Sequence, residues 1–313
     1  MGIKLRDLLS TKGFVVIIII AIFYLIFSIY SDLDKIKDNF ETINFAYAPI
    51  ILSSVLFSIF LKSIRQKILL KQINLDLTIK QSFIIFTGGL SLLFTPGASG
   101  MLIKSFFLKN KFNAPISKTV PIILMERYLD VVGIMSIISI CWIFYPIESL
   151  KIPIMLLNLT LIFLLVLFRN QKLFSLFMII FNKILKNKTE LINDTTHSIR
   201  NFSNYKLAYL TPLSIVCWIF DAVAFYFCFL SFDISFNILQ TSIISFFSLV
   251  FGFITLIPGG IGVTEMSMLG LLINEGVEIS LGSSMILFLR MTTIWFGVIL
   301  GLITVKAAFT NKN

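Results

Sequence analysis

Residues 256–265 read Leu-Ile-Pro-Gly-Gly-Ile-Gly-Val-Thr-Glu and separate two apolar runs, 238–257 and 266–273. Pro258 lacks a backbone donor, and the glycines tolerate non-helical dihedral angles, so a continuous helix is not expected here. In hydrocarbon an unsatisfied backbone group costs several kcal/mol, so a broken helix is tolerated only inside protein or beside a water-filled cavity. We interpret the break and the carboxylate of Glu265 as a functional site. The alternative is an ordinary extracytoplasmic loop between two helices.

The composition indicates an integral membrane protein. Of 313 residues, 57% are hydrophobic and 13% charged, with a mean hydropathy of +0.96, whereas a soluble domain carries roughly a quarter charged residues. The net charge of +10 is scattered between apolar runs, which favours cytoplasmic loops and lipid headgroups as its partners and argues against nucleic acid. Cys141, Cys217 and Cys228 all lie inside apolar runs, so we expect no disulfide framework, no metal site and no cofactor.

Six runs are long enough to cross a membrane, which requires about 20 apolar residues. They are residues 13–31, 45–63, 119–145, 152–168, 207–231 and 281–305. A basic flank follows the second span and contains Lys62, Arg65, Lys67, Lys71 and Lys80. The positive-inside rule places this flank in the cytoplasm and predicts a multi-pass protein of the cell membrane with both termini cytoplasmic.

Two further apolar elements are interrupted. Residues 81–95 and 101–108 flank the first interruption and have basic residues on both outer sides, which predicts a re-entrant hairpin from the cytoplasm. Residues 238–257 and 262–274 flank the second, whose outer sides are poor in Lys and Arg, so this hairpin enters from outside. The predicted helix breaks are Pro96, Gly97, Gly100, Pro258, Gly259, Gly260 and Gly262.

The fold class that follows is an all-α polytopic membrane protein with six to eight transmembrane helices, the upper number applying if both broken elements cross fully. Residues 45–145 and 207–305 each read span, broken hairpin, span, in opposite orientations, which predicts an inverted repeat. Inverted repeats with broken helices are typical of transporters that bind substrate near the membrane midplane.

We therefore treat residues 1–313 as one membrane domain. Its parts are the N-terminal span and loop (1–44), the first repeat unit (45–145), a linking span and cytoplasmic basic stretch (146–206) and the second repeat unit (207–313). Within the basic stretch, the apolar spacing over 174–184 predicts an amphipathic surface helix.

Six ionisable residues lie within spans or at the second break. They are Glu126, Arg127, Asp130, Asp221, Glu265 and Arg290. Each costs about 2.5–3.5 kcal/mol at a helix centre on insertion scales, so each should face a partner or a wet cavity. Glu126 and Asp130 share one helix face, and Arg127 can pair with a neighbour from another helix. A buried ion-pair network that only fixes helix packing is the alternative, but their position beside two broken helices favours substrate binding and transport.

The chemistry of this set favours an anion. The half-helices after Gly100 and Gly262 should present unpaired N–H groups and a positive dipole end. Arg127 and Arg290 add cations whose bidentate geometry suits phosphate. The four carboxylates could bind an amino or sugar group or carry a coupling proton, and the residues leave these roles open.

At these positions the chain resembles the lysylphosphatidylglycerol synthase transmembrane-region family. The second break is similar to the family's Pro-Gly-Gly-x-Gly-x-x-Glu signature, and the first break, 95–100, is a looser match because Ala98-Ser99 stands where a further glycine is common. The run Glu126-Arg127-Tyr128-Leu129-Asp130 resembles the family's Glu-Arg-x-x-Asp span, and Arg290 followed by Trp295 and Gly301 resembles its last span.

The resemblance implies movement of a phospholipid or a polyprenyl-phosphate-linked sugar between leaflets, with no catalytic residue in this chain. The chain stops at Asn313, eight residues after the last predicted span, which argues against lysyl transfer by this chain alone. The alternatives are an intramembrane enzyme and a scaffold for a glycosyltransferase or lipid-modifying enzyme. The sequence leaves the lipid, the direction, the energy source and the oligomeric state open, including a homo-oligomer.

Overall fold

The computed structural model describes residues 23, 24, 27, 31–93, 103–169, 204–255 and 257–309. Over these residues the protein is helical and contains no strand. The helices are α3 (Leu33–Glu41), α4 (Ala48–Leu70), α5 (Ile79–Leu90), α6 (Ile103–Phe112), α7 (Ile116–Phe144), α8 (Lys151–Arg169), α11 (Asn204–Leu230), α12 (Ile238–Ile254), α13 (Val263–Asn274), α14 (Ile279–Arg290) and α15 (Phe296–Phe309).

The all-α membrane class predicted from the sequence is confirmed. Among the residues described, four helical stretches are long and apolar enough to cross a membrane, namely Phe45–Ile73, Ile116–Phe144, Tyr209–Leu230 and Ile279–Lys306. The exact number of spans between six and eight stays a prediction. Most of the first predicted span, 13–31, and all of the predicted amphipathic segment, 174–184, lie outside the described residues.

Polar caps begin the first helix of each broken element. The Thr78 hydroxyl accepts from the Gln81 amide and the Gln81 side chain accepts from the Thr78 amide, a capping box that starts α5. The Asn237 side chain accepts from the Gln240 amide at 2.8 Å and starts α12. Each cap satisfies backbone donors that the first turn of a helix leaves unpaired, so both hairpins have defined entry points.

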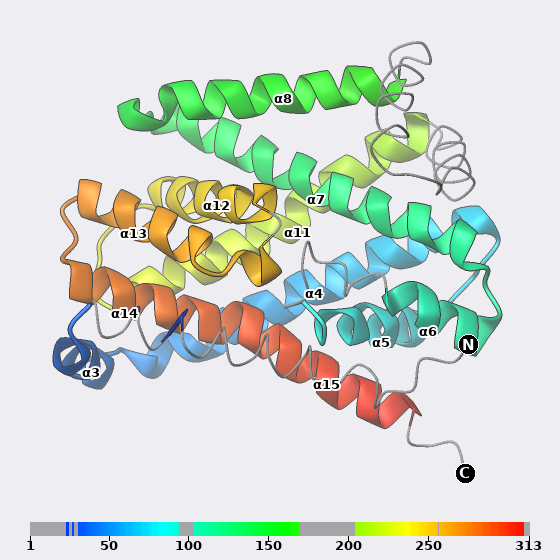
Figure 1. Cartoon of the computed structure of the whole chain (residues 1–313), viewed down its shortest axis with the longest axis horizontal. Helices are drawn as coiled ribbons and strands as arrows, with labels where there is room; N and C mark the ends of the chain where they lie inside the picture. Colours follow the sequence, from blue (N-terminus) through cyan, green and yellow to red (C-terminus); the bar gives the residue numbers. More distant parts are fainter. Residues whose placement is uncertain are drawn as a thin grey trace.

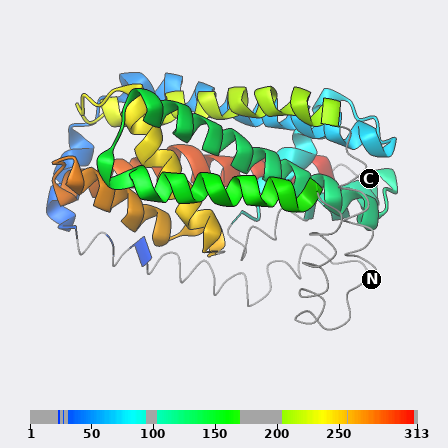
Figure 2. The same cartoon turned by 90° about the horizontal axis from the view of Figure 1, so that it is seen from above.

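The two broken elements enter the helix bundle from opposite ends (Figure 1). α5 and α6 lie side by side at the end where α4 finishes and α7 begins, while α12 and α13 lie side by side at the end where α11 finishes and α14 begins. Figures 1 and 2 agree in placing α4 and α11 next to one another along the long axis. This is the arrangement that an inverted repeat predicts, although the division into repeat units stays a prediction.

A continuous apolar core joins the two hairpin regions. Ile138 on α7, Phe229 on α11 and Phe246 on α12 are fully buried within it. α15 approaches α5 closely because Gly301 has no side chain: a Cβ there would lie 2.4 Å from the Thr87 carbonyl oxygen. Small residues that permit such close helix contacts are typical of membrane interfaces.

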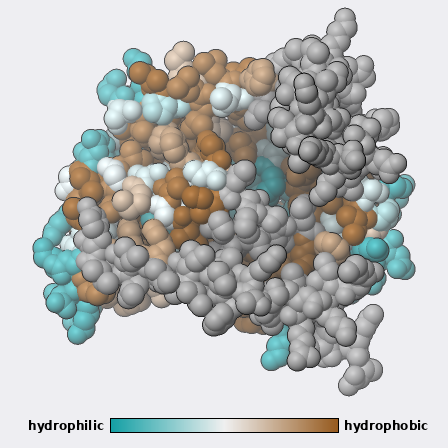
Figure 3. Space-filling view, viewed as in Figure 1, coloured by the Kyte–Doolittle hydropathy of each residue, from teal (hydrophilic) through white to brown (hydrophobic). Residues whose placement is uncertain are grey.

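On the face drawn in Figure 3, the described hydrophilic residues lie mostly toward the two ends and hydrophobic residues lie between them. Within the long helices, Ile162 on α8 is 55% exposed and Ile219 on α11 is 45% exposed, as expected for lipid-facing side chains. At one end the Lys35 ammonium lies 2.9 Å from the Glu278 carboxylate and joins α3 to the start of α14. The hydrogen bond from Lys35 lowers the pKa of Glu278, but both side chains are more than half exposed, so the pair contributes little to stability.

Candidate functional site

The second helix break takes the form predicted from its sequence. Gly259, Gly260 and Gly262 have φ angles of 64°, 66° and 89°, a region that disfavours residues with a Cβ. A short 3₁₀ turn, Pro258–Gly260, therefore separates α12 from α13. The first break, with Pro96, Gly97 and Gly100, lies outside the described residues, and its conformation stays a prediction.

Glu265 closes the start of α13. Its Oε2 accepts a hydrogen bond from the Gly262 amide at 2.7 Å. This corrects the expectation that the N–H groups at this helix end are free for an anion, because the protein's own carboxylate occupies one of them. The negative charge at a helix N-terminus is also favourable to the helix dipole.

The same carboxylate is the counter-ion of Arg290. Glu265 Oε1 accepts from Arg290 Nε at 2.8 Å and from the Tyr24 hydroxyl at 3.0 Å, and both charged side chains are buried. Arg290 Nη1 and Nη2 are buried without a hydrogen-bond acceptor in the described part of the chain. Arg290 is the last residue of α14, directly before the π-helical turn Met291–Trp295. Such π turns occur often at functional sites.

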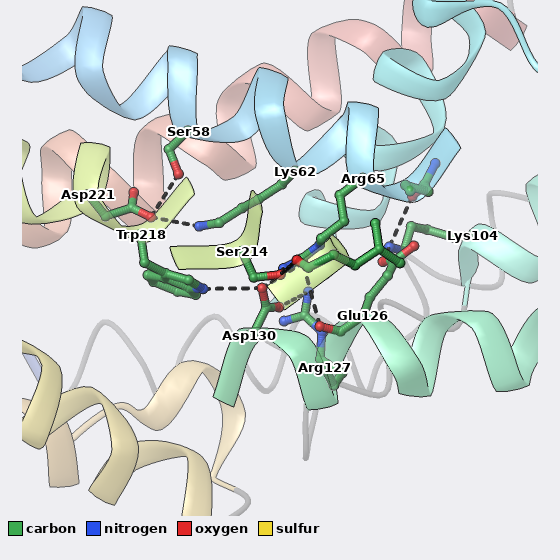
Figure 4. A network of polar contacts seen from close by, with 12 residues as sticks. Ser58, Lys62, Arg65, Lys104, Glu126, Arg127, Asp130, Ser214, Trp218 and Asp221 are labelled. Carbon is green, nitrogen blue, oxygen red and sulfur yellow. Dashed lines mark hydrogen bonds and ion pairs between the residues drawn. The ribbon is translucent and has the colours of Figure 1, made fainter. Parts of the chain in front are cut away.

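A second buried ion pair lies in the first half of the chain. The Lys104 ammonium near the start of α6 contacts Glu126 Oε2 on α7 and donates to Gln66 Oε1 at 3.1 Å. Gln66 Nε2 in turn donates to the Ser82 carbonyl at 3.2 Å. These contacts tie α6, α7, α4 and α5 together (Figure 4).

Asp130 is shared between two arginines. Its Oδ1 lies 2.7 Å from Arg65 Nη2 on α4 and accepts from Trp218 Nε1 at 3.3 Å, while its Oδ2 lies 2.9 Å from Arg127 Nη2. Arg127 therefore pairs on its own helix, and the expectation of a partner from another helix is wrong among the described residues. Arg65 also donates to the Ser214 hydroxyl at 2.9 Å, so it is held from α7 and α11 at once.

Asp221 on α11 completes the charged region. Its Oδ2 accepts from Lys62 Nζ at 2.7 Å and from the Ser58 hydroxyl at 2.8 Å, both on α4. Lys62 Nζ also lies 3.5 Å from the centroid of the Trp218 ring, a cation–π contact. Figure 4 shows this group next to the Asp130 group along the α4–α11 interface.

Sequence reasoning placed Lys62 and Arg65 in a cytoplasmic flank, and this was wrong. Both lie on α4, where the Arg65 side chain is 0% exposed and the Lys62 side chain 12% exposed. The available signal was helical spacing, because Ser58, Lys62 and Arg65 recur at positions i, i+4 and i+7 of one face. Lys104 was likewise missed, although it follows the first predicted break by only four residues.

A cavity of about 340 Å³ joins the two halves of the chain. Its charged lining consists of Lys62, Arg127, Asp130, Asp221 and Arg290. The break glycines Gly259 and Gly260 also border it, and most of its remaining lining is apolar. Four of the six predicted site residues therefore face one space. Glu126 and Glu265 do not line it: Glu265 pairs with Arg290, which does, and Glu126 pairs with Lys104, which does not.

The arrangement is that of a small, largely apolar chamber with fixed charges on its wall. Guanidinium groups there can bind phosphate or carboxylate, and the apolar lining can accept acyl or prenyl chains. Within the described residues no group of three His, Cys, Asp or Glu side chains could hold a metal ion.

Comparisons with known proteins point to one family. The family model described as lysylphosphatidylglycerol synthase TM region matches residues 14–301. The UPF0104 membrane protein PH1989 of Pyrococcus horikoshii is 26% identical over 235 residues, covering 66% of this chain and 70% of the relative. The UPF0104 membrane protein MJ1078 of Methanocaldococcus jannaschii is 26% identical over 208 residues, covering 66% of this chain and 88% of the relative.

Proposed function

Because the chain belongs to the lysylphosphatidylglycerol synthase transmembrane-region family, we propose that it moves an anionic phospholipid or a lipid-linked sugar between membrane leaflets. The observation that carries this proposal is the cavity between the two hairpin regions, with Arg127 and Arg290 on its wall. A lipid headgroup needs a polar passage through hydrocarbon, and buried charges beside broken helices supply one.

The geometry supports a passage that opens alternately. The two hairpins begin at opposite ends of the bundle, and the break of the second borders the cavity (Figure 1). In this proposal each hairpin controls access from its own side while the charged wall stays in place. The chain transports lipid without converting it chemically, and its membrane is the cell membrane with both termini cytoplasmic.

A cavity-filling variant tests whether the chamber is the passage. Gly297 lines the cavity, and a Cβ there would meet only Leu90 Cδ1, at the ordinary contact distance of 3.6 Å. Gly297→Leu should therefore fold normally and abolish exchange, because its side chain occupies the space that the headgroup needs. The measurement is leaflet exchange of fluorescent phosphatidylglycerol and of a labelled polyprenyl-phosphate sugar in phosphatidylcholine vesicles.

The matched control is Gly270→Leu on α13. A Cβ at Gly270 has nothing within 4 Å, so this variant adds the same side chain away from the cavity and should exchange lipid at the wild-type rate. Full exchange by a folded Gly297→Leu protein would contradict the passage. Exchange of neither label by folded wild-type protein would contradict transport itself and favour an enzymatic or accessory role.

A further inference from the structure

The ion-paired charges of the site do not balance among the described residues. Five cationic side chains there form ion pairs with four carboxylates: the cations are Lys62, Arg65, Lys104, Arg127 and Arg290, and the carboxylates are Glu126, Asp130, Asp221 and Glu265. With each group in its usual ionised form, one positive charge remains. A proton that moves within any of these pairs leaves the sum unchanged, so the excess does not depend on the protonation of a particular pair.

The two interruptions of the broken elements and the first predicted span add no charge of their own. Residues 94–102 read Phe-Thr-Pro-Gly-Ala-Ser-Gly-Met-Leu, and position 256 is a leucine, so neither contains an ionisable side chain. Residues 13–30 of the first predicted span contain no Asp, Glu, Lys or Arg either. A cation in excess at a largely apolar cavity attracts an anion, so a site with this composition favours an anionic ligand from outside the chain.

The excess charge is located at Arg127. Asp130 forms ion pairs with both Arg65 and Arg127. The Arg65 side chain is 0% exposed, so it is the partner that depends on the Asp130 charge. The Arg127 side chain is 31% exposed and lines the cavity, and its Nε has no acceptor in the described part of the chain. Arg127 is therefore the cation that a ligand in the cavity can reach.

We propose that the cavity selects a lipid headgroup with a net charge of minus one, a single phosphodiester, and that Arg127 provides its counter-charge. Arg290 lines the same cavity, and two of its guanidinium nitrogens have no partner among the described residues, so it supplies further donors to the phosphate. This inference rests on the proposed transport function and narrows its substrate class.

Charge balance then ranks the candidate lipids. Phosphatidylglycerol brings one negative charge and neutralises the site. Lysylphosphatidylglycerol carries two ammonium groups and one phosphate, so it adds a positive charge to a site that already has one in excess. A polyprenyl-monophosphate sugar also has a single phosphodiester and neutralises the site, whereas a polyprenyl-diphosphate sugar brings two negative charges and leaves the site negative. The family's name thus does not predict the preferred lipid of this chain, and unmodified anionic phospholipid is favoured over the aminoacylated one.

The test measures binding and exchange for the same three lipids. Purified protein is incubated in detergent micelles with an equimolar mixture of phosphatidylglycerol, lysylphosphatidylglycerol and a polyprenyl-diphosphate sugar, and the co-purifying lipid is quantified. Exchange of each labelled lipid is then measured in phosphatidylcholine vesicles. Wild-type protein should retain and exchange phosphatidylglycerol about tenfold more than either of the other two lipids. A ratio of about tenfold is the effect expected when one charge-assisted hydrogen bond to the ligand is lost.

Three variants separate charge from fold. Arg127→Gln should remove the preference, because the site is already neutral without the Arg127 charge. The variant should still fold, because Asp130 keeps Arg65 as its partner. Arg127→Lys should keep the preference with slower exchange, since it retains the charge but not the bidentate geometry. Lys118→Gln removes the same charge from an exposed position on the same helix, α7, and should change nothing.

The outcomes are distinguishable. Preferential retention of lysylphosphatidylglycerol or of the diphosphate lipid would overturn the charge assignment while leaving transport intact. An unchanged preference in Arg127→Gln would overturn the role of Arg127. Preferential retention of phosphatidylglycerol without exchange of any lipid would support the binding site and contradict the transport function on its own.

Discussion

At the scale of single residues, Glu265 has two structural roles, which its sequence context indicated only in part. It accepts from the Gly262 amide at 2.7 Å and from Arg290 Nε at 2.8 Å, so one carboxylate caps α13 and neutralises a buried guanidinium. These contacts support the packing interpretation of this residue, and its functional interpretation stays a prediction. Removing one partner of a buried pair is more damaging than removing both, because the remaining charge is left in a medium of low polarity.

This asymmetry gives a prediction for the pair. Glu265→Gln alone should lower the free energy of unfolding by about 3–5 kcal/mol, since it leaves the Arg290 charge buried and uncompensated. Glu265→Gln combined with Arg290→Met should recover most of that loss. Thermal unfolding of the detergent-purified variants measures both, and a double variant no more stable than the single one would show that the ion pair is not the cause.

At the scale of helices, each hairpin is joined to the helix that follows it by one buried ion pair, and the two pairs have opposite polarity. Lys104 of the first hairpin contacts Glu126 of α7, whereas Glu265 of the second contacts Arg290 of α14. A close backbone approach adds to this, since a Cβ at Gly301 of α15 would lie 2.4 Å from the Thr87 carbonyl oxygen and 2.7 Å from the Ser91 amide nitrogen of the α5 region. Backbone atoms cannot move aside as a flexible side chain can.

The helix contact predicts the effect of a single methyl group. Gly301→Ala should destabilise the protein by about 1–3 kcal/mol, because α15 must move away from α5. Gly270→Ala is the matched control in α13, where a Cβ meets nothing within 4 Å and the gain in helix propensity is at most about 1 kcal/mol. Melting temperatures of the two variants should therefore shift in opposite directions or, for Gly270→Ala, not at all. Equal shifts would contradict the close contact.

At the scale of the whole molecule, the two ends differ in charge. The end where α6 finishes and α7 begins carries Lys109, Lys111 and Lys118, while the opposite end carries the acidic residues of α3 and of the α13–α14 turn (Figure 1). The positive-inside rule predicts that the first end faces the cytoplasm. With that orientation the two hairpins are expected to open toward different compartments, as the proposed alternating passage requires.

Cysteine labelling in intact cells tests this orientation. Asp34→Cys on α3 should react with a membrane-impermeant maleimide from outside, whereas Lys109→Cys on α6 should react only after the cells are made permeable. The three native cysteines are buried, and wild-type protein is the control for their reactivity. Labelling of both positions from one side would contradict hairpins that open to opposite sides, and the reverse pattern would overturn only the assignment of the cytoplasmic face.

The amino-acid sequence by itself determined the membrane class, the position of the second break and which charged residues within apolar spans require a partner. These follow from local rules: apolar runs of sufficient length form helices in lipid, proline and glycine interrupt them, and a charge in hydrocarbon needs a partner. Glu126, Arg127, Asp130, Asp221, Glu265 and Arg290 could therefore be singled out without coordinates.

Only the tertiary structure decided which charge meets which. The sequence pattern placed Lys62 and Arg65 at the start of a basic loop, but α4 continues past both residues. Lys62 therefore pairs with Asp221, and Arg65 pairs with Asp130. Lys104 faces Glu126 because α6 packs against α7, a contact that no local pattern specifies. The balance of charge in the cavity depends on the helices that come together, because a pairing energy is defined by distance in space and not by separation along the chain.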